Sequence, residues 1–358
     1  MNRRKFESLL KLAVEDGVTD IILAVGEPPI FRYHNSLMEV KSEFLEAHDT
    51  ELIARLLLQY RLEDAATFTA MDTTYEIADV GRFRASIFKQ RTLFRIILRV
   101  IPIEIRSFAD LNLPLDLINI AELRRGLVLV TGATGQGKST TLSAIIEHIN
   151  RTRKAHIITV EDPIEFTYQK ARGLITQREV NEDIPDYKTA LKQALRQSPD
   201  VIMAAEVRDA ETFEAVLTAA ETGHLTLSAI HTTDAQRTFT RILGFYPQQE
   251  RQSLRERLAS NLVAIISLRL LMKKDNTGRI PVVEMLRMNG VIAECLRNHD
   301  RIHEIHSHME RGRDYYGMRT FDQDIVTLYE KDIIDKSTAL LAATHPTGVE
   351  RAIAFNGN

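Results

Sequence analysis

Residues 132–139, with the sequence GATGQGKS, constrain the fold of this chain more than any other segment. An unbroken apolar run at 127–130 precedes them, and apolar residues at 142, 145, 146 and 149 follow with helical spacing. Glycines let backbone amides converge on phosphate oxygens, and a following helix adds the positive end of its dipole. This order predicts a phosphate-binding loop rather than a glycine-rich turn without a nucleotide. The residues predicted to hold the nucleotide are Thr134, Gly135, Gln136, Gly137, Lys138, Ser139 and Thr140.

Two side chains of this loop have a predicted task. Lys138 would reach the β and γ phosphates of a nucleoside triphosphate, and Ser139 would place its hydroxyl on Mg²⁺. The later apolar runs at 156–160, 201–205 and 225–230 alternate with helical patterns. Such alternation predicts an α/β fold with a parallel sheet, in which ligands bind at the carboxyl ends of the strands.

Polar residues follow these apolar runs directly. Glu206 suits a Walker B role as a holder of Mg²⁺, and Glu165 or Glu161 would position or deprotonate the attacking water. His231 would sense the γ-phosphate. Each glutamate could also be a surface or helix-terminal carboxylate, and His231 a loop histidine, so the prediction depends on all of them meeting at one site.

Composition limits the class of protein. The chain has 358 residues, and 46 lysines and arginines against 49 acidic residues leave a net charge of −3, which argues against a nucleic-acid motor. The single cysteine excludes an internal disulfide framework and a tetracysteine zinc module. No apolar signal core follows the basic start and no apolar run reaches 18 residues, so we expect a cytoplasmic protein.

The domain organisation is predicted from changes in pattern. Residues 1–101 read as a small α+β domain, with strands near 20–25, 73–78 and 82–100. Residues 102–115, bracketed by Pro102 and Pro114, are the predicted linker, and 116–358 the second domain. From about 249 the period favours helices up to about 343. One predicted helical stripe contains Leu254, Leu258, Leu262, Ile265 and Ile266.

The first domain carries a block of positive charge. The segment from Gly81 to Arg99 has six basic residues and no acid, and strand alternation places Arg82 and Arg84 opposite Phe83. A solvated strand face and a nucleic-acid patch are two interpretations. The favoured one is a set of arginine fingers that complete a phosphate site, because a guanidinium group matches phosphate oxygens and keeps its charge.

Longer segments carry a family resemblance. The phosphate loop, TVEDPIEF and DVIMAAEVRDAETFEAVLTAAETGHLTLSAIHTTDA resemble the secretion-type ATPases, with their acidic box, atypical Walker B segment and histidine box. The segments GRFR…FKQR…LRVIP, LITQREV and GMRTFDQDIVTLYEKDII are similar to the twitching-motility retraction ATPases of type IV pili, the PilT and PilU group. The resemblance covers about residues 5–345.

The resemblance implies a PAS-like N-terminal domain, a RecA-like P-loop domain with C-terminal helices, and a homohexamer that binds ATP and Mg²⁺ between the domains. It also implies docking on an inner-membrane pilus platform protein at the cytoplasmic face, a second retraction ATPase as a further partner, and pilus depolymerisation as the output. The residue roles that it implies are a catalytic base at Glu165, the Walker B glutamate at Glu206, the histidine box at His231 and His224, and phosphate-approaching arginines at Arg84 and Arg99.

Four positions depart from the family pattern. Ala205 replaces the usual glycine before the Walker B glutamate, Ala133 and Gln136 replace proline and serine, and Ser198 stands where an acid is common. None removes a charge or hydroxyl that the chemistry needs, so we expect ATP hydrolysis. Two alternatives stay open: a PilU-like accessory subunit, towards which GMRTFDQD leans, and a nucleotide-binding regulator with little turnover, which the Ala205 methyl group favours.

Four histidines gather in the segment RNHDRIHEIHSH. His299 and His303 are spaced i, i+4 as on a metal-binding helix, and His306 and His308 follow. No carboxylate or cysteine partner is evident at ligand spacing in the sequence. We therefore expect no metal there.

Overall fold

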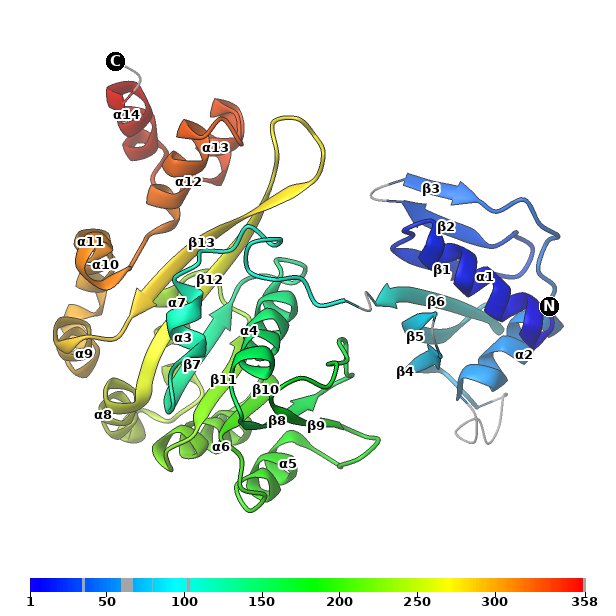
Figure 1. Ribbon diagram of the computed structural model, residues 1–358, viewed down its shortest axis with the longest axis horizontal. Coiled ribbons are helices and arrows are strands. Elements are labelled where there is room, and N and C mark those ends of the chain that lie inside the picture. The colour runs from blue at the N-terminus through cyan, green and yellow to red at the C-terminus, as the bar shows by residue number, and fades with distance from the viewer. Residues whose placement is uncertain (34–35, 59–66, 79, 102–103, 357–358) are drawn as a thin grey trace. The chain divides into compact units, whose positions relative to one another are not determined.

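The structure is a computed structural model that describes residues 1–33, 36–58, 67–78, 80–101 and 104–356 (Figure 1). The chain forms two compact units. The first contains Met1–Glu104 and the short segment Pro163–Thr167, and the second contains Ile105–Asp162 and Tyr168–Asn358. Pro102 and Ile103 of the predicted linker lie outside the described residues.

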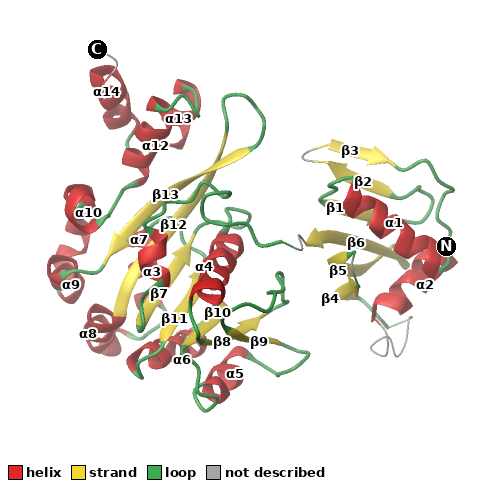
Figure 2. Ribbon diagram, in the orientation of Figure 1, coloured by secondary structure: helices red, strands yellow, loops and turns green. Residues whose placement is uncertain are grey.

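In its described residues, the first unit is an antiparallel sheet with two helices (Figure 2). Its strands lie in the order β3-β2-β1-β6-β5-β4. The described elements are α1 (Arg3–Glu15), β1 (Asp20–Leu23), β2 (Ile30–Tyr33), β3 (Ser36–Glu39), α2 (Ala47–Leu58), β4 (Ala70–Ile77), β5 (Gly81–Gln90) and β6 (Leu93–Ile101). The predicted alternation in β5 is confirmed, because Phe83, Ala85 and Ile87 are fully buried. They pack with Phe6 of α1 in one apolar cluster, while Arg82 and Arg84 point to the other face.

The second unit is built around a seven-stranded sheet in the order β13-β12-β7-β11-β10-β8-β9, in which only the β12–β13 pair is antiparallel. Its described elements are α3 (Leu117–Ala121), β7 (Gly126–Thr131), α4 (Lys138–Thr152), β8 (His156–Glu161), β9 (Leu174–Glu179), α5 (Tyr187–Ala194), β10 (Val201–Val207), α6 (Ala210–Glu221), β11 (Leu225–Ile230), α7 (Ala235–Gly244), η2 (Gln248–Glu250), α8 (Arg251–Asn261), β12 (Leu262–Met272), β13 (Arg279–Arg287), α9 (Gly290–Arg297), η3 (His299–Glu304), α10 (Ile305–Arg311), α11 (Arg313–Tyr316), α12 (Phe321–Glu330), α13 (Lys336–Ala342) and α14 (Pro346–Asn356).

Both faces of this sheet are covered. Along β7, Leu127 and Leu129 belong to one apolar cluster, whereas Val128 and Val130 belong to another. Alternate side chains of a strand point to opposite faces, so an unbroken apolar run suits a strand buried on both sides. The parallel sheet and the strands predicted at 127–130, 156–160, 201–205 and 225–230 are confirmed as β7, β8, β10 and β11.

The predicted helical stripe after position 249 is wrong in its second half. Leu254 and Leu258 lie on α8, but Leu262, Ile265 and Ile266 belong to β12, which pairs with β7 and β13. The helix ends at Asn261 and the strand begins at the next residue, so no turn residue separates them. The leucines and isoleucines therefore keep a helical period across a change of structure.

Short side chains fix where several helices of the second unit begin. Asp186, Asp209 and Asp234 precede α5, α6 and α7, and each carboxylate accepts a hydrogen bond from the backbone N–H three residues later. The C-terminal helices α12–α14 pack on the distal part of the β12–β13 hairpin through Phe321 and Ile280 (Figure 1). Within the described residues, no helix has the length and apolar character that crossing a membrane requires.

Candidate nucleotide site

The loop between β7 and α4 has a backbone that only glycine adopts easily. Gly132 has a φ angle of 150°, and a Cβ atom there would lie 2.8 Å from the carbonyl oxygen of Leu268. Gly137, the residue before α4, has a φ angle of 92°. Gly132 is required because the loop approaches β12 closely. Gly137 is required because the backbone is left-handed where the chain enters α4.

Gln136 ties this loop to the neighbouring strand. Its Oε1 accepts a hydrogen bond from the backbone N–H of Leu270 in β12, at 2.6 Å. The side chain that replaces the usual serine of the family pattern thus holds the loop from behind. The predicted contact of Gln136 with a nucleotide stays a prediction.

Lys138 lies inside the loop with its ammonium group held by backbone oxygens. Nζ donates to the carbonyl oxygens of Gly132 and Ala133, each at 3.0 Å, and lies 3.2 Å from Nδ1 of His231. Only 8% of Lys138 is exposed. The lysine is therefore confined beside the loop, where its charge can meet a phosphate group.

His231 connects Lys138 to the predicted Walker B glutamate. Its Nε2 lies 2.8 Å from Oε2 of Glu206. Nδ1 faces the ammonium group and so acts as acceptor, which leaves Nε2 to carry the proton and donate to Glu206. The neutral imidazole fits both contacts. Lys138 begins α4 after the loop that follows β7, Glu206 lies near the carboxyl end of β10, and His231 directly follows β11.

The position of Glu206 depends on an irregularity in β10. The pairing with β11 shifts between Ala204 and Val207, so β10 has one extra residue there. Ala205 is not among the described residues with a positive φ angle, so the backbone at this position does not require glycine. Burial raises the pKa of Glu206, but the hydrogen bond from His231 and the charge of Arg208 lower it more, and the pKa lies below its usual value. Glu206 is therefore an anion at neutral pH.

Ser139 and Glu206 supply the donor atoms that Mg²⁺ prefers. A hydroxyl and a charged carboxylate are hard oxygen ligands, and both belong to the second unit. Ser139 is exposed in the first turn of α4, as are Thr134 and Gly135 in the loop before it, while Thr140 is half-buried. The donor chemistry of these residues fits the ion that a triphosphate brings with it.

Glu161, the alternative base, is engaged with its own sheet. It is 5% exposed, and its Oε1 accepts hydrogen bonds from Thr159 at 2.7 Å and from Gln177 at 3.0 Å. A carboxylate with these partners is an anchor between β8 and β9 rather than a base aimed at water. This leaves Glu165 as the candidate.

Glu165 and the two candidate arginines belong to the first unit. Arg84 and Arg99 lie directly opposite each other on β5 and β6. Two like charges at such positions repel, and each arginine has acidic partners: Arg84 contacts Asp72 at 3.3 Å and Glu165 at 3.5 Å, and Arg99 contacts Asp20 at 3.0 Å. The predicted arginine pair thus exists as two neighbouring cations, each with an ion-pair partner.

Arg208 is a charged neighbour of Glu206 that the sequence analysis did not identify. Arg208 pairs with Glu206 and lies 4.0 Å from Asp162, and its i+2 spacing from Glu206 at a strand end is the signal that could have revealed it. His224 precedes β11 and contacts the carbonyl oxygen of Ala219 at 3.0 Å. His231 follows the same strand, so the two residues of the histidine box lie at opposite ends of β11.

Glu284 is a second residue near the site that the sequence analysis did not identify. This β13 residue is 4% exposed, and its Oε1 accepts hydrogen bonds from the backbone N–H of Ala235 at 2.8 Å and from the Ser267 hydroxyl at 3.2 Å. Ala235 begins α7, directly after the loop that holds His231. Glu284 therefore fixes the far end of that loop.

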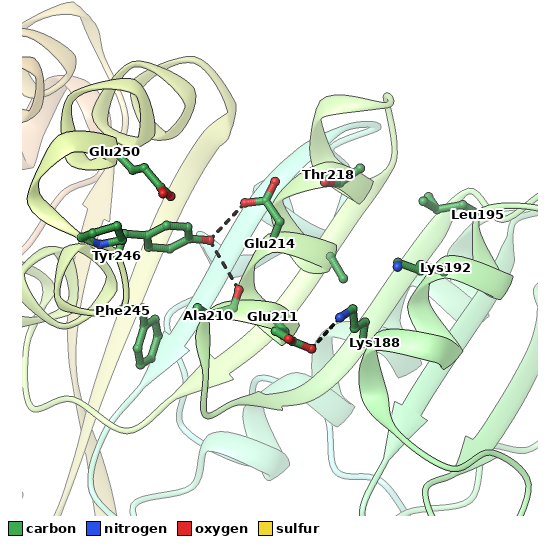
Figure 3. A pocket seen from close by; sticks show the side chains of 12 residues that line it. Lys188, Lys192, Leu195, Ala210, Glu211, Glu214, Thr218, Phe245, Tyr246 and Glu250 are labelled. Carbon is green, nitrogen blue, oxygen red and sulfur yellow. Dashed lines mark hydrogen bonds and ion pairs between the residues drawn. The ribbon is translucent and has the colours of Figure 1, made fainter.

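A separate surface pocket of about 400 Å³ lies between α5, α6 and the segment after α7 (Figure 3). None of the predicted nucleotide-binding residues lines it. Its polar walls are paired with each other, since Lys188 contacts Glu211 at 2.6 Å and the Tyr246 hydroxyl donates to Glu214 at 3.1 Å. These contacts join the helices around the pocket.

A sequence model of the family described as Type II/IV secretion system protein matches residues 95–331. The chain belongs to this family. A curated relative from Pseudomonas aeruginosa, "Type IV pilus ATPase PilU", is 37% identical over 340 residues, which cover 95% of this chain and 88% of the relative. The "Type IV pilus retractation ATPase PilT" of the same organism is 34% identical over 339 residues, 94% of this chain and 98% of the relative.

A solved structure of the pilus retraction motor PilT with bound ADP has a TM-score of 0.88 and 36% identity, and covers 96% of this chain and 98% of that one. The predicted fold class is thereby confirmed: an N-terminal antiparallel-sheet domain, then a mostly parallel α/β domain with C-terminal helices. The predicted enzyme class, a P-loop ATPase, is confirmed at the level of this family, as is the resemblance to the PilT and PilU group.

Proposed function

We propose that this chain hydrolyses ATP as one subunit of a hexameric ring motor that powers type IV pilus retraction and twitching motility. The observation that carries the proposal is the line of contacts from Lys138 through His231 to Glu206, which joins the phosphate loop to a charged Walker B glutamate. The relatives support the biological part, because their names assign them to pilus retraction and to type IV pili.

In this proposal each residue of the second unit has one task. The backbone of residues 132–137 and Lys138 bind the triphosphate, which competes with the carbonyl oxygens of Gly132 and Ala133 for the ammonium group. Ser139 and Glu206 hold the Mg²⁺ ion, which supplies charge neutralisation at the phosphates when bound. His231 donates its Nε2 proton to Glu206 and contacts Lys138 through Nδ1. A shift of the Lys138 ammonium group toward the phosphates therefore changes the hydrogen bond that Glu206 receives.

The first unit supplies the remaining roles. Glu165 orients or deprotonates the attacking water, and Arg84 and Arg99 bind the charge that develops on the phosphate. The Arg84–Glu165 ion pair of 3.5 Å suits this division of labour, because an incoming phosphate that takes Arg84 releases the glutamate. Both side chains are about one-third exposed, so neither is locked by burial.

The first experiment measures phosphate release by purified protein with Mg²⁺ and ATP. Lys138→Ala should lose at least about 100-fold in turnover, because it removes the cation that meets the phosphates. Lys154→Ala, at an exposed position of the same unit, is the matched control and should keep the rate. A wild-type rate in Lys138→Ala would refute the site.

The second experiment separates arginine roles. Arg84→Ala should lower kcat by about 10³-fold or more while nucleotide affinity changes little, as for an arginine finger. Arg91→Ala, at the exposed turn of the same hairpin, should change neither quantity. Equal values of kcat for Arg84→Ala and wild type would remove Arg84 from the reaction.

The proposed function also predicts the oligomeric state of this chain, its binding partner and its place in the cell. We expect a homohexamer mass in solution, and binding to an inner-membrane pilus platform protein at the cytoplasmic face. A monomeric mass in the presence of ATP and Mg²⁺ would contradict the ring. Co-purification of the platform protein from a strain that carries a tagged chain tests the docking.

A PilU-like accessory role is the second candidate, and the 37% identity to the PilU relative favours it. The deciding observation is pilus retraction in a strain where this chain is the only candidate motor. Retraction there supports a PilT-like motor, whereas retraction only with a second ATPase supports the accessory role. Phosphate release by the purified chain would dismiss a regulator without turnover.

A further inference from the structure

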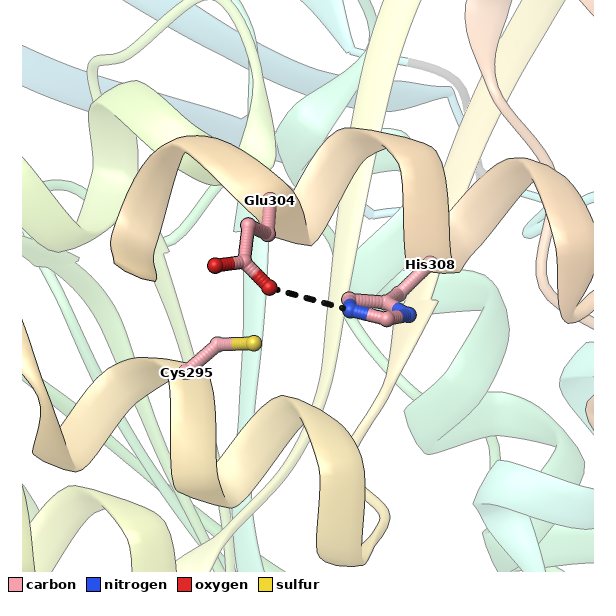
Figure 4. A group of neighbouring side chains, drawn as sticks. All are labelled: Cys295, Glu304 and His308. Atoms are coloured by element: carbon pink, nitrogen blue, oxygen red, sulfur yellow. Dashed lines mark ion pairs between the residues drawn. The ribbon is translucent and has the colours of Figure 1, made fainter. Parts of the chain in front are cut away.

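Three potential metal ligands meet at one place in the second unit, remote in sequence from the phosphate loop (Figure 4). Cys295 lies on α9, Glu304 ends η3, and His308 lies on α10. The thiol sulfur, a carboxylate oxygen and an imidazole nitrogen all lie within 4.8 Å of one another. Figure 4 shows the three side chains pointing toward a common gap between the two helical segments.

This cluster revises the expectation for the histidine-rich segment. His299 and His303 lie in the 3₁₀-helix η3, so they do not form the predicted i, i+4 pair of an α-helix. His308 is the histidine that acquires a carboxylate and a thiol as neighbours. Cys295 comes from α9, thirteen residues earlier in the sequence, which is why no ligand spacing is visible along the chain.

The spacing of His308 and Glu304 suits two ligands of one ion. Nε2 of His308 lies 3.6 Å from Oε2 of Glu304, which is too long for a hydrogen bond. Two ligands at about 2.1 Å from a tetrahedral ion are separated by about 3.4 Å. The observed separation is thus close to that of a ligand pair.

The three side chains of the cluster differ in their exposure to solvent. Cys295 is 0% exposed, whereas the side chains of Glu304 and His308 are 32% and 26% exposed. An ion can therefore enter from solvent and keep a water molecule as fourth ligand. Arg301 binds Glu304 at 2.9 Å, and a carboxylate has lone pairs for both a guanidinium group and an ion.

Burial and the neighbouring charges determine whether the Cys295 thiol carries a proton. Burial raises the pKa of the Cys295 thiol, Arg301 lowers it, and Glu304 and Glu294 raise it. The thiol is therefore protonated at neutral pH without an ion, and a bound cation would displace that proton.

We propose that Cys295, Glu304 and His308 bind one divalent transition-metal ion of the zinc class, with water in the fourth position. A thiolate and an imidazole select a borderline-soft ion over Mg²⁺ or Ca²⁺. The ion fastens α10 to α9. This site is independent of the nucleotide site and of the proposed function.

The test uses Co²⁺ as a spectroscopic substitute for zinc in the metal-free full-length chain, without nucleotide. Because the chain has a single cysteine, a thiolate-to-cobalt charge-transfer band can arise only from Cys295. The band should saturate at one ion per chain and vanish when Zn²⁺ displaces Co²⁺. The unfolding temperature of the chain should rise with Zn²⁺.

Substitutions at the half-exposed ligands avoid a change in the core. His308→Gln and Glu304→Gln should each weaken cobalt binding by at least about 10-fold. His303→Gln, at an exposed histidine of the same segment, should bind as wild type does. Far-ultraviolet circular dichroism confirms that the variants are folded. No charge-transfer band in the wild-type chain, or wild-type affinity in His308→Gln, would overturn the site.

Discussion

Replacing Glu284 by glutamine should change how the stability of the protein depends on pH. Glu284 is buried, and burial is the largest cause that raises its pKa from the ordinary 4.5 to about 7, against the hydrogen bond from Ala235. A glutamine can accept the hydrogen bonds from Ala235 and Ser267 through its Oε1. It therefore imitates the protonated acid without its titration.

The magnitude follows from the two pKa values. Between 4.5 and about 7 the folded protein binds more protons than the unfolded chain. This contribution to stability is complete below 4.5 and is lost as the pH rises through about 7. One unit of pKa difference corresponds to about 1.36 kcal/mol, so the difference between the unfolded and folded pKa values of Glu284 corresponds to about 3 kcal/mol. Glu284→Gln should thus be more stable than wild type by roughly 3 kcal/mol at pH 8, and by less than about 1 kcal/mol at pH 5.

Urea unfolding of the full chain at pH 5 and pH 8 measures this difference. Glu43→Gln, at an exposed position of the first unit, removes one surface carboxylate and should leave the pH dependence unchanged. Histidines also titrate in this range, so the quantity that counts is the difference between each variant and wild type. The reasoning fails if Glu284→Gln and wild type have parallel stability profiles from pH 5 to pH 8.

Three further substitutions test the packing around the site and the C-terminal helices. Gly132→Ala should abolish nucleotide binding in a fluorescent-nucleotide titration, because its Cβ would lie 2.8 Å from the Leu268 carbonyl oxygen; tight binding would show that the loop can move. Tyr187→Phe should raise the free energy of unfolding by up to about 1 kcal/mol, since the buried hydroxyl has no hydrogen-bond partner within the described part of the chain; a loss of stability would reveal one. Thr320→Ala should cost about 1 kcal/mol in urea unfolding by breaking the capping box with Gln323, and Thr320→Ser should restore most of it; equal losses in both variants would refute the capping role.

Much of the nucleotide site could be predicted because its signals are local. The glycine loop, the apolar strands and the polar residue after each strand lie within a few positions of one another, and parallel strands bring their carboxyl ends to one edge. The meeting of Lys138, Glu206 and His231 in the second unit follows from that rule. The place of Glu165 beside these residues stays a prediction.

Other features had no local signal. The predicted helical stripe runs on into β12 because α8 passes into this strand without a turn residue, and only pairing with β7 identifies the strand. Glu284 reads as one acid in an apolar strand, and its task depends on Ala235, which lies 49 residues away in the chain. Such partners cannot be inferred from spacing, because the path of the chain between them is unspecified.

The amino-acid sequence alone determined the phosphate loop, the parallel α/β class and the family resemblance, since hydrophobic period, glycine conformation and motif spacing act over short distances. The tertiary structure decided which side chains are partners. Lys138 and His231 are 93 residues apart and in contact, and Cys295 meets Glu304 and His308 only because α9 and α10 pack together. Folding brings these groups within reach by burying apolar faces, and the polar contacts are a consequence of that packing.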